Sequence, residues 1–173
     1  METESTVINH EEAVARWFQR DSVGTEIGAF ETPIPSLNPI YVDRFAEYAG
    51  KPCLADYWGD ACRLPFKSNS LNYVATSHVL EHVANPVSAL LEWHRVLVSG
   101  GLMYMVVPDR RKTFDHPREL TDPEHMWKDY LNGTSQSDPT HINEFVTGVD
   151  WSMYRPEIAE DRIESEQVAE QDQ

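Results

Sequence analysis

The sequence has few cysteines, few basic residues and no long apolar run. Its two cysteines, Cys53 and Cys62, are too few for a disulfide framework and favour reduced thiols in the cytoplasm. Only 14 Lys and Arg residues stand against 29 Asp and Glu, and the net charge of −15 would repel the phosphates of nucleic acids and anionic membranes. The longest apolar run, GLMYMVV, has the length of a strand and cannot span a bilayer. We therefore expect a cytoplasmic protein with neither nucleic-acid nor membrane partners.

Enough apolar residues are present for one hydrophobic core. Hydrophobic residues make up 40% of the 173-residue chain, a length that suits one domain. Acidic residues gather at the end, where residues 156–173 hold seven acids, one arginine and no aromatic residue. Such a segment cannot bury enough apolar surface to offset the entropy lost on ordering. These features predict a single domain over residues 1–155 and an acidic, disordered tail over residues 156–173.

Strand-like and helix-like segments alternate along the first two thirds of the chain. A helix is predicted from Asn9, with Glu12 as its capping-box partner. A second helix is predicted from Asn85 to the glycine pair at 100 and 101, with Leu91 and His94 on its apolar stripe. The run LMYMVVP that follows predicts a strand buried on both faces of a parallel sheet. This alternation predicts an α/β fold, a Rossmann-like open and mostly parallel sheet with flanking helices.

Polar and small residues follow the predicted strands. Ligands of open parallel sheets bind beyond the carboxyl ends of the strands. Asp43 at such an end is placed to accept two hydrogen bonds from a ribose diol, and Asp60 could accept one from the exocyclic amine of a purine. Gly28 lets a ligand approach the backbone. The pattern predicts a pocket for a nucleoside, while EIGAFE lacks the GxGxxG that a dinucleotide pyrophosphate requires.

The stretch from Asp60 to Pro108 carries an ordered set of motifs. An acidic residue and alanine are followed by Leu-Pro-Phe, a strand, the turn VLEH, a helix ending in LxxGG and an apolar strand. Together with EIGAF and YVDRF before it, this order resembles the class I S-adenosylmethionine-dependent methyltransferases of the small-molecule, type 11 kind. The resemblance covers residues 25–108. It implies that the protein is an enzyme, a transferase that uses S-adenosyl-L-methionine to methylate a small-molecule acceptor.

The resemblance also assigns positions to the cofactor. It implies that the methionine moiety is bordered by Glu26 and Gly28, the ribose is held by Asp43, the adenine by Asp60 and Ala61, and the floor beside the sulfonium is formed by Ser77 and His78. The segment from Pro108 onward resembles a subgroup that acts on sugars or related metabolites. There, residues 108–150 would form a helical segment that covers the acceptor site.

Two departures from the family pattern leave a second interpretation open. The segment EIGAFETPIPSLNP keeps only Gly28 of the usual glycine-rich loop, and its prolines leave little room for the helix that normally follows. No strand pair is evident between residues 109 and 173, so the sheet lacks the usual last antiparallel strands. The chain could be truncated, or a partner chain or second copy could complete the sheet. The alternative function is therefore a catalytically inactive, methyltransferase-like binding or regulatory subunit.

The cluster Asp109, Arg110 and Arg111 is the one basic spot in an acidic chain. Arginine forks suit a carboxylate or phosphate, so these residues are candidates for binding the acceptor. Salt bridges to neighbouring acids such as Asp115 explain the cluster equally well. Both interpretations stay open.

Histidines supply the candidates for catalysis. His125 and His141 each open a predicted helix in the cover segment, and a neutral imidazole can act as general base for an acceptor hydroxyl. We expect no metal site. His78 and His82 lack the HExxH order and an obvious third ligand, and the histidines of the cover segment show no diagnostic spacing.

Overall fold

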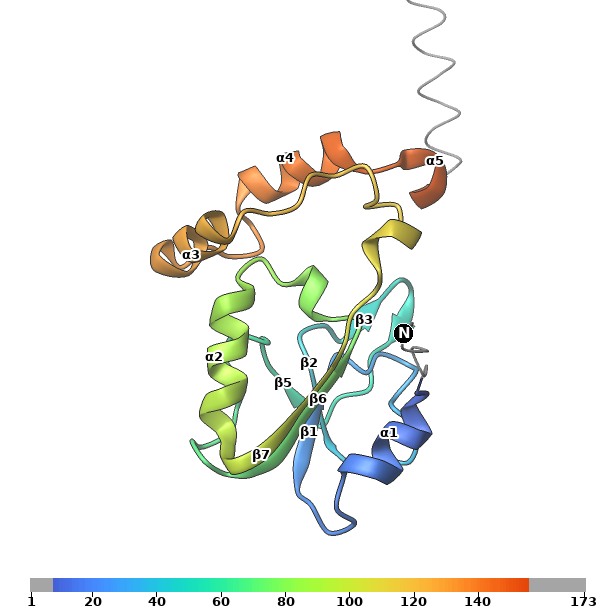
Figure 1. Ribbon diagram of the computed structural model, residues 1–173, viewed down its shortest axis with the longest axis vertical. Coiled ribbons are helices and arrows are strands. Elements are labelled where there is room, and N and C mark those ends of the chain that lie inside the picture. Colours follow the sequence, from blue (N-terminus) through green and yellow to red (C-terminus); the bar gives the residue numbers. More distant parts are fainter. Residues whose placement is uncertain (1–7, 156–173) are drawn as a thin grey trace, which may run out of the picture. The chain divides into compact units, whose positions relative to one another are not determined.

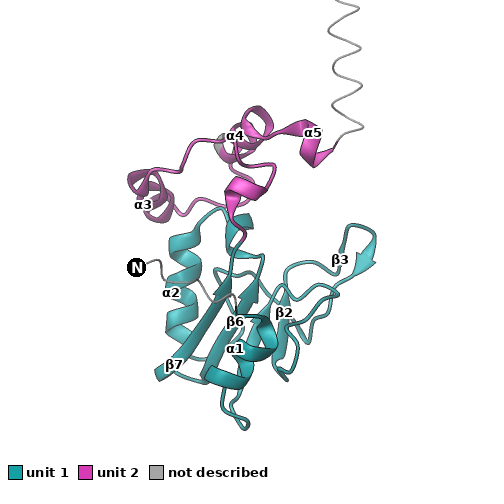
Figure 2. Cartoon of the chain, turned by 45° about the vertical axis from the view of Figure 1, so that its right-hand side comes forward, with its two compact units in different colours: residues 1–107 teal, residues 108–173 magenta. Residues whose placement is uncertain are grey.

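The computed structural model describes residues 8–155, apart from the side chain of Thr140, and the predicted acidic tail at 156–173 lies outside them. The chain forms two compact units, Met1–Val107 (unit 1) and Pro108–Gln173 (unit 2), coloured separately in Figure 2. We predicted a single domain in which residues 108–150 cover the acceptor site. This depends on how the two units are placed relative to each other, so it stays a prediction. None of the described helices has the length and apolar character that crossing a bilayer requires.

Unit 1 is built on one parallel sheet (Figure 1). Its strands are β1 (Gly24–Ile27), β2 (Ile40–Asp43), β5 (Tyr57–Trp58), β6 (Leu71–Ser77) and β7 (Leu97–Val106). They lie in the order β5-β2-β1-β6-β7, and each neighbouring pair is parallel. The predicted Rossmann-like α/β fold is confirmed. The order along the chain reverses between β1 and β6, which marks the switch point of an open α/β sheet.

Helix α1 (His10–Trp17) covers one face of the sheet. The capping box predicted for it is confirmed. The Asn9 side chain accepts a hydrogen bond from the Glu12 backbone N–H, and the Glu12 side chain accepts one from the Asn9 backbone N–H. Val14 packs with Tyr73 and Ala75 of β6 in a small core. The apolar side chains of α1 therefore bind it to this face.

Helix α2 (Pro86–Val96) covers the opposite face, as Figure 2 shows. The predicted cap is confirmed, since the Asn85 side chain accepts from the Ser88 N–H and Pro86 opens the helix. The predicted end at the glycine pair is wrong, because β7 begins directly at Leu97. The predicted stripe also fails in part. Leu91 and His94 are exposed, and Ala89, Trp93 and Val96 are buried instead.

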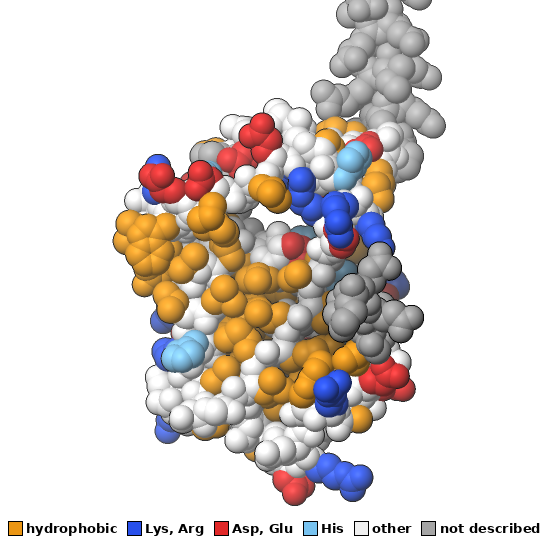
Figure 3. Space-filling model, viewed as in Figure 1, with side chains coloured by type: hydrophobic (Ala, Val, Ile, Leu, Met, Phe, Trp, Pro, Cys, Tyr) orange, Lys and Arg blue, Asp and Glu red, His pale blue; other side chains and the backbone are white. Residues whose placement is uncertain are grey.

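Strand β7 is an edge strand. Among the described residues, only β6 pairs with it, and most of its side chains are half-buried or exposed. The expectation that it is buried on both faces is therefore wrong. Figure 3 views the protein from the same side as Figure 1. On this side, hydrophobic side chains gather over the middle of unit 1. Met105 is an exposed member of β7.

The remaining elements are short. In unit 1, the hairpin β3 (Glu47–Tyr48) and β4 (Lys51–Pro52) follows β2, and the 3-10 turn η1 (Leu80–His82) follows β6. Unit 2 contains η2 (Arg110–Lys112), α3 (Pro123–Asn132), α4 (Pro139–Gly148) and α5 (Trp151–Tyr154). Its described residues contain no strand, in agreement with the prediction that the sheet lacks its last antiparallel pair.

Candidate functional site

The strand ends of unit 1 bring together four of the residues predicted to bind the cofactor. Ile27 pairs with Val42 on one side and with Thr76 on the other, so β1, β2 and β6 end at one edge. The Gly28 N–H donates to the Val42 carbonyl at 2.9 Å, which fixes the chain just beyond β1. This edge therefore carries four of the predicted residues: Glu26, Gly28, Asp43 and Ser77. The switch point lies between β1 and β6, and ligands of open α/β sheets bind beyond the carboxyl ends of the strands at this point.

Glu26 is the most buried charged residue of this edge. Its side chain is 1% exposed, and Oε1 accepts a 2.9 Å hydrogen bond from the Ile34 N–H. Oε2 is buried without a hydrogen-bond partner. Burial raises the pKa of this carboxyl from 4.5 to about 7, against the opposing effect of the Ile34 N–H. A buried oxygen without a partner indicates a place for an external donor.

Gly28 adopts a left-handed backbone conformation with φ +68°. A Cβ atom built there would lie 2.6 Å from Cγ2 of Val79, the residue before η1. The glycine is thus required by the close approach of Val79, in addition to its φ angle. This contact ties the turn after β1 to the turn after β6.

Asp43 ends β2 and is 6% exposed. Its Oδ1 accepts from the Phe45 N–H at 2.9 Å, which orients the carboxylate. Cys53 lies beside it, and loss of solvation, followed by the charge and hydrogen bond of Asp43, raises the pKa of that thiol. The position suits a carboxylate that accepts hydrogen bonds from a diol.

Asp60 and Ala61 are held by contacts within the protein. Asp60 Oδ1 accepts from the Cys62 N–H at 2.8 Å, and its Oδ2 lies 3.4 Å from Nη1 of Arg44. The Ala61 carbonyl accepts from Nε1 of the buried Trp93 at 2.9 Å. These bonds fix the turn after β5, and the adenine-binding role of both residues stays a prediction.

Ser77 ends β6, and His78 begins the turn that follows it. Ser77 is half-buried at the end of β6, and the His78 N–H donates to the Val106 carbonyl at 2.9 Å. His78 has φ +57°, and its Nδ1 lies 3.5 Å from Oε1 of Glu81. The arrangement braces the turn in which the sequence predicts the floor of the cofactor site.

The basic cluster of unit 2 is engaged within that unit. Arg111 forms a fork with Asp109, with Nη2 to Oδ2 at 2.7 Å and Nε to Oδ1 at 2.9 Å. This fork, with the Arg111 N–H, lowers the pKa of Asp109 to about 2. Arg110 donates through Nη1 to the main-chain carbonyls of Asp115, His116 and Arg118. Acceptor binding by these three residues stays a prediction.

His125 and His141, the predicted candidates for general base, lie together in unit 2. Their ring centroids are 5.3 Å apart, and both Nε2 atoms face Oδ2 of Asp129, at 3.3 Å and 3.2 Å. Both Nε2 atoms are buried and have no hydrogen-bond partner. The structure therefore brings the two candidate residues together around one carboxylate oxygen.

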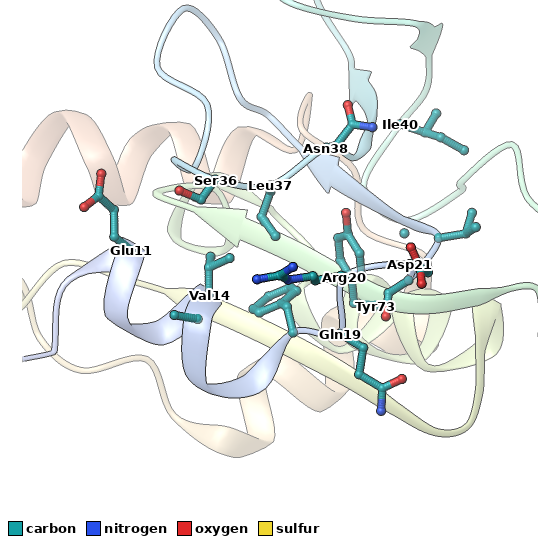
Figure 4. A pocket seen from close by; sticks show the side chains of 15 residues that line it. Glu11, Val14, Gln19, Arg20, Asp21, Ser36, Leu37, Asn38, Ile40 and Tyr73 are labelled. Atoms are coloured by element: carbon teal, nitrogen blue, oxygen red, sulfur yellow. The ribbon is translucent and has the colours of Figure 1, made fainter.

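A cavity of about 600 Å³ lies elsewhere in unit 1. Figure 4 shows its lining side chains, among them Val14 of α1, Leu37 of the segment after β1 and Tyr73 of β6. Gly24 and Ile40, the first residues of β1 and β2, also line it, so it opens at the amino ends of the strands. We place the candidate site at the carboxyl ends, because the switch point and the unpartnered Glu26 oxygen lie there.

Three contributors to this edge escaped the sequence analysis: Arg44, Cys53 and Val79. Arg44 directly follows Asp43, so its proximity to the end of β2 could have been read from the sequence. The contact of Val79 with Gly28 joins segments that are distant in the chain, and no local pattern signals it.

Comparison with known proteins finds partial matches to methyltransferases. Residues 39–105 match a family model described as a methyltransferase domain. A demethylmenaquinone methyltransferase of Staphylococcus epidermidis is 49% identical over 45 residues, which are 26% of this chain and 19% of that protein. An uncharacterized 37.1 kDa protein in transposon TN4556 of Streptomyces fradiae is 34% identical over 104 residues, 54% of this chain and 30% of that one. The chain thus spans less than a third of the length of these curated relatives.

One solved structure is also similar over part of the chain. An S-adenosylmethionine-dependent methyltransferase of Thermotoga maritima, described as a possible histamine N-methyltransferase, has a TM-score of 0.48 at 22% identity, over 72% of this chain and 58% of its own. The family match over residues 39–105 confirms the predicted resemblance to the class I methyltransferases.

Proposed function

We propose that unit 1, which contains this methyltransferase domain, binds S-adenosyl-L-methionine at the carboxyl edge of its sheet and transfers its methyl group to a small-molecule acceptor. The observation that carries the proposal is the buried Oε2 of Glu26, which lacks a hydrogen-bond partner at the switch point of the sheet. The ammonium group of the methionine moiety would supply the missing donor. Asp43, one strand away, would accept from the ribose hydroxyls.

Methyl transfer from S-adenosyl-L-methionine needs little acid–base catalysis. The bound cofactor supplies an electrophilic methyl group on a positively charged sulfur. The protein contributes by positioning the acceptor in line with the methyl carbon and by excluding water. Glu26, Gly28 and Asp43 would hold the cofactor, while Asp60, Ala61, Ser77 and His78 would complete its surroundings. A base is needed only where the acceptor must lose a proton.

The acceptor would be a sugar-like molecule or another small metabolite. In unit 2, the Arg111 side chain is 83% exposed and could exchange its fork with Asp109 for an acceptor carboxylate or phosphate. Arg110 would instead hold the segment in shape through its bonds to main-chain carbonyls.

Calorimetry with S-adenosylhomocysteine tests the cofactor site. Asp43→Asn removes the charge that would accept from the ribose, and hydrogen bonds to a charged group contribute about 1.5–3 kcal/mol. We expect Asp43→Asn to weaken binding roughly 10- to 100-fold. Asp21→Asn is the matched control, because Asp21 is exposed and lines the cavity at the opposite end of the strands. No binding by the folded protein at high micromolar ligand, or equal losses in both variants, would refute the proposal.

A second function is favoured by the edge of the sheet. No described strand pairs with the outer side of β7, and an unpaired edge invites pairing with another chain. The chain could thus act as an inactive, methyltransferase-like binding or regulatory subunit, or as part of a homo-oligomer. Light scattering separates the two functions, since a monomer that binds S-adenosylhomocysteine contradicts the second one.

A further inference from the structure

Unit 2 holds a compact group of titratable side chains on two helices. His125 and Asp129 lie one turn apart on α3, and His141 and Glu144 lie one turn apart on α4. Nε2 of His125 is 3.3 Å from Oδ2 of Asp129, and Nε2 of His141 is 3.2 Å from the same oxygen. Two imidazole nitrogens and one carboxylate oxygen therefore converge from both helices.

The two separations from Oδ2 of Asp129, 3.3 Å and 3.2 Å, fit a metal ion. Ligand atoms bound to tetrahedral zinc at about 2.0–2.1 Å stand about 3.3 Å from one another. Both Nε2 atoms are buried, and neither has a hydrogen-bond partner, so their contacts with Asp129 lack hydrogen-bond alignment. Buried polar atoms are normally satisfied. A cation held by all three atoms would satisfy both nitrogens at once.

Neighbouring groups hold the ligand side chains in place. Thr134 Oγ1 donates to Asp129 Oδ1 at 3.0 Å, which directs Oδ2 toward the histidines. Glu144 Oε2 lies 3.7 Å from Nδ1 of His141, the ring nitrogen away from Asp129. Ligand atoms of His125, His141 and Glu144 all lie within 4.8 Å of one another. Metal-bound histidines commonly have a carboxylate near the second ring nitrogen, which orients the ring.

Unit 2 has little apolar core to hold its helices. Among its described side chains, only Asp129 and Val149 are buried, whereas Leu120, Trp127 and Leu131 are exposed. Small units of this kind are often stabilised by a structural metal. The group on α3 and α4 is in the right place to clamp the two helices.

We propose that His125, His141 and Asp129 bind a divalent transition-metal ion, Zn²⁺, which clamps α3 to α4, with Glu144 orienting His141. Two imidazoles and a carboxylate suit zinc, whereas magnesium and calcium prefer oxygen ligands alone. Three protein ligands leave the fourth position for water. This proposal differs from the expectation of no metal site and from the general-base role predicted for the two histidines.

Metal titration of the full chain tests the assignment. The purified protein is stripped with chelator, and Zn²⁺ binding is measured by competition with a chromophoric chelator. Visible absorption is then recorded with Co²⁺ as the probe. We expect one ion per chain, a tetrahedral Co²⁺ spectrum without a thiolate charge-transfer band, and a higher melting temperature with Zn²⁺. His125→Ala and His141→Ala should abolish stoichiometric binding, and Glu144→Gln should weaken it roughly 10-fold.

His116→Ala is the matched control, because His116 is an exposed histidine of the same unit outside this group. Circular dichroism establishes that each variant is folded, and Asp129→Asn gives a second test if a histidine variant fails to fold. Failure of the wild type to bind Zn²⁺ tighter than the His125→Ala protein overturns the proposal. So does an equal loss in His116→Ala, or a thiolate band that places the ion on a cysteine. The readout needs no methyl donor, so it is independent of the cofactor proposal.

Discussion

Replacing Gly28 with alanine should destabilise the protein through two separable effects. The left-handed backbone, with φ +68°, costs an alanine about 1 kcal/mol. The added Cβ would also lie 2.6 Å from Cγ2 of Val79, a stiff β-branched side chain packed against the core that includes Val74 and Trp93. Overpacking of this kind costs about 1–3 kcal/mol, so we expect the free energy of unfolding to fall by about 2–4 kcal/mol in Gly28→Ala.

Gly50 provides the matched control. It has φ +77° in the β3–β4 turn, and nothing lies within 4 Å of a Cβ built there. Gly50→Ala should therefore lose only about 1 kcal/mol. The unfolding free energies are measured in urea by far-ultraviolet circular dichroism, together with Val79→Ala and the Gly28→Ala/Val79→Ala double variant.

The double variant isolates the steric effect. Removing the Val79 methyl groups should relieve the clash, so the loss in the double variant should be about 1–3 kcal/mol smaller than the sum of the two single losses. Equal losses in Gly28→Ala and Gly50→Ala, with no coupling to Val79, would refute the packing argument.

Further outcomes concern Glu26 and Trp93. Since burial raises the pKa of Glu26 from 4.5 to about 7, the folded state holds its proton more tightly than the unfolded state. This contribution to stability is complete below pH 4.5 and is lost as the pH rises to about 7, a change of about 3 kcal/mol. The free energy of unfolding of Glu26→Gln, measured in urea, should thus rise relative to that of the wild type between pH 4.5 and about 7. The same pH dependence in both proteins would contradict the raised pKa of Glu26. Trp93→Phe leaves the Ala61 carbonyl without its donor and should cost about 1–2 kcal/mol in the same assay, whereas Trp17→Phe, on an exposed residue, should cost less.

Local patterns predicted several elements of this fold accurately. The Asn9 and Glu12 capping box and the Asn85-Pro86 helix start were confirmed because caps depend on residues close in sequence. The end of α2 was mispredicted because Leu97 and Val98 continue a helical pattern equally well. Pairing of β7 with β6 draws these residues into the strand instead.

The exposure of the β7 side chains could not be predicted, because it depends on which elements pack against the strand. Its continuous apolar run suggested burial on both faces, but most of its side chains are half-buried or exposed. The side chains at the strand ends illustrate the opposite case. Parallel strands end at one edge, so Gly28, Asp43 and Ser77 could be placed together from the strand pattern alone.

The α/β class, the strands that end in polar residues and the likeness to methyltransferases could be read from the sequence, because they follow from periodicity, caps and short motifs. Three features required the folded structure: an oxygen of Glu26 is buried without a hydrogen-bond partner, Val79 requires the glycine at 28, and His125 and His141 share Asp129. Each of these depends on distances between segments remote in the chain, and such distances are set by packing of the whole unit rather than by local residue preference.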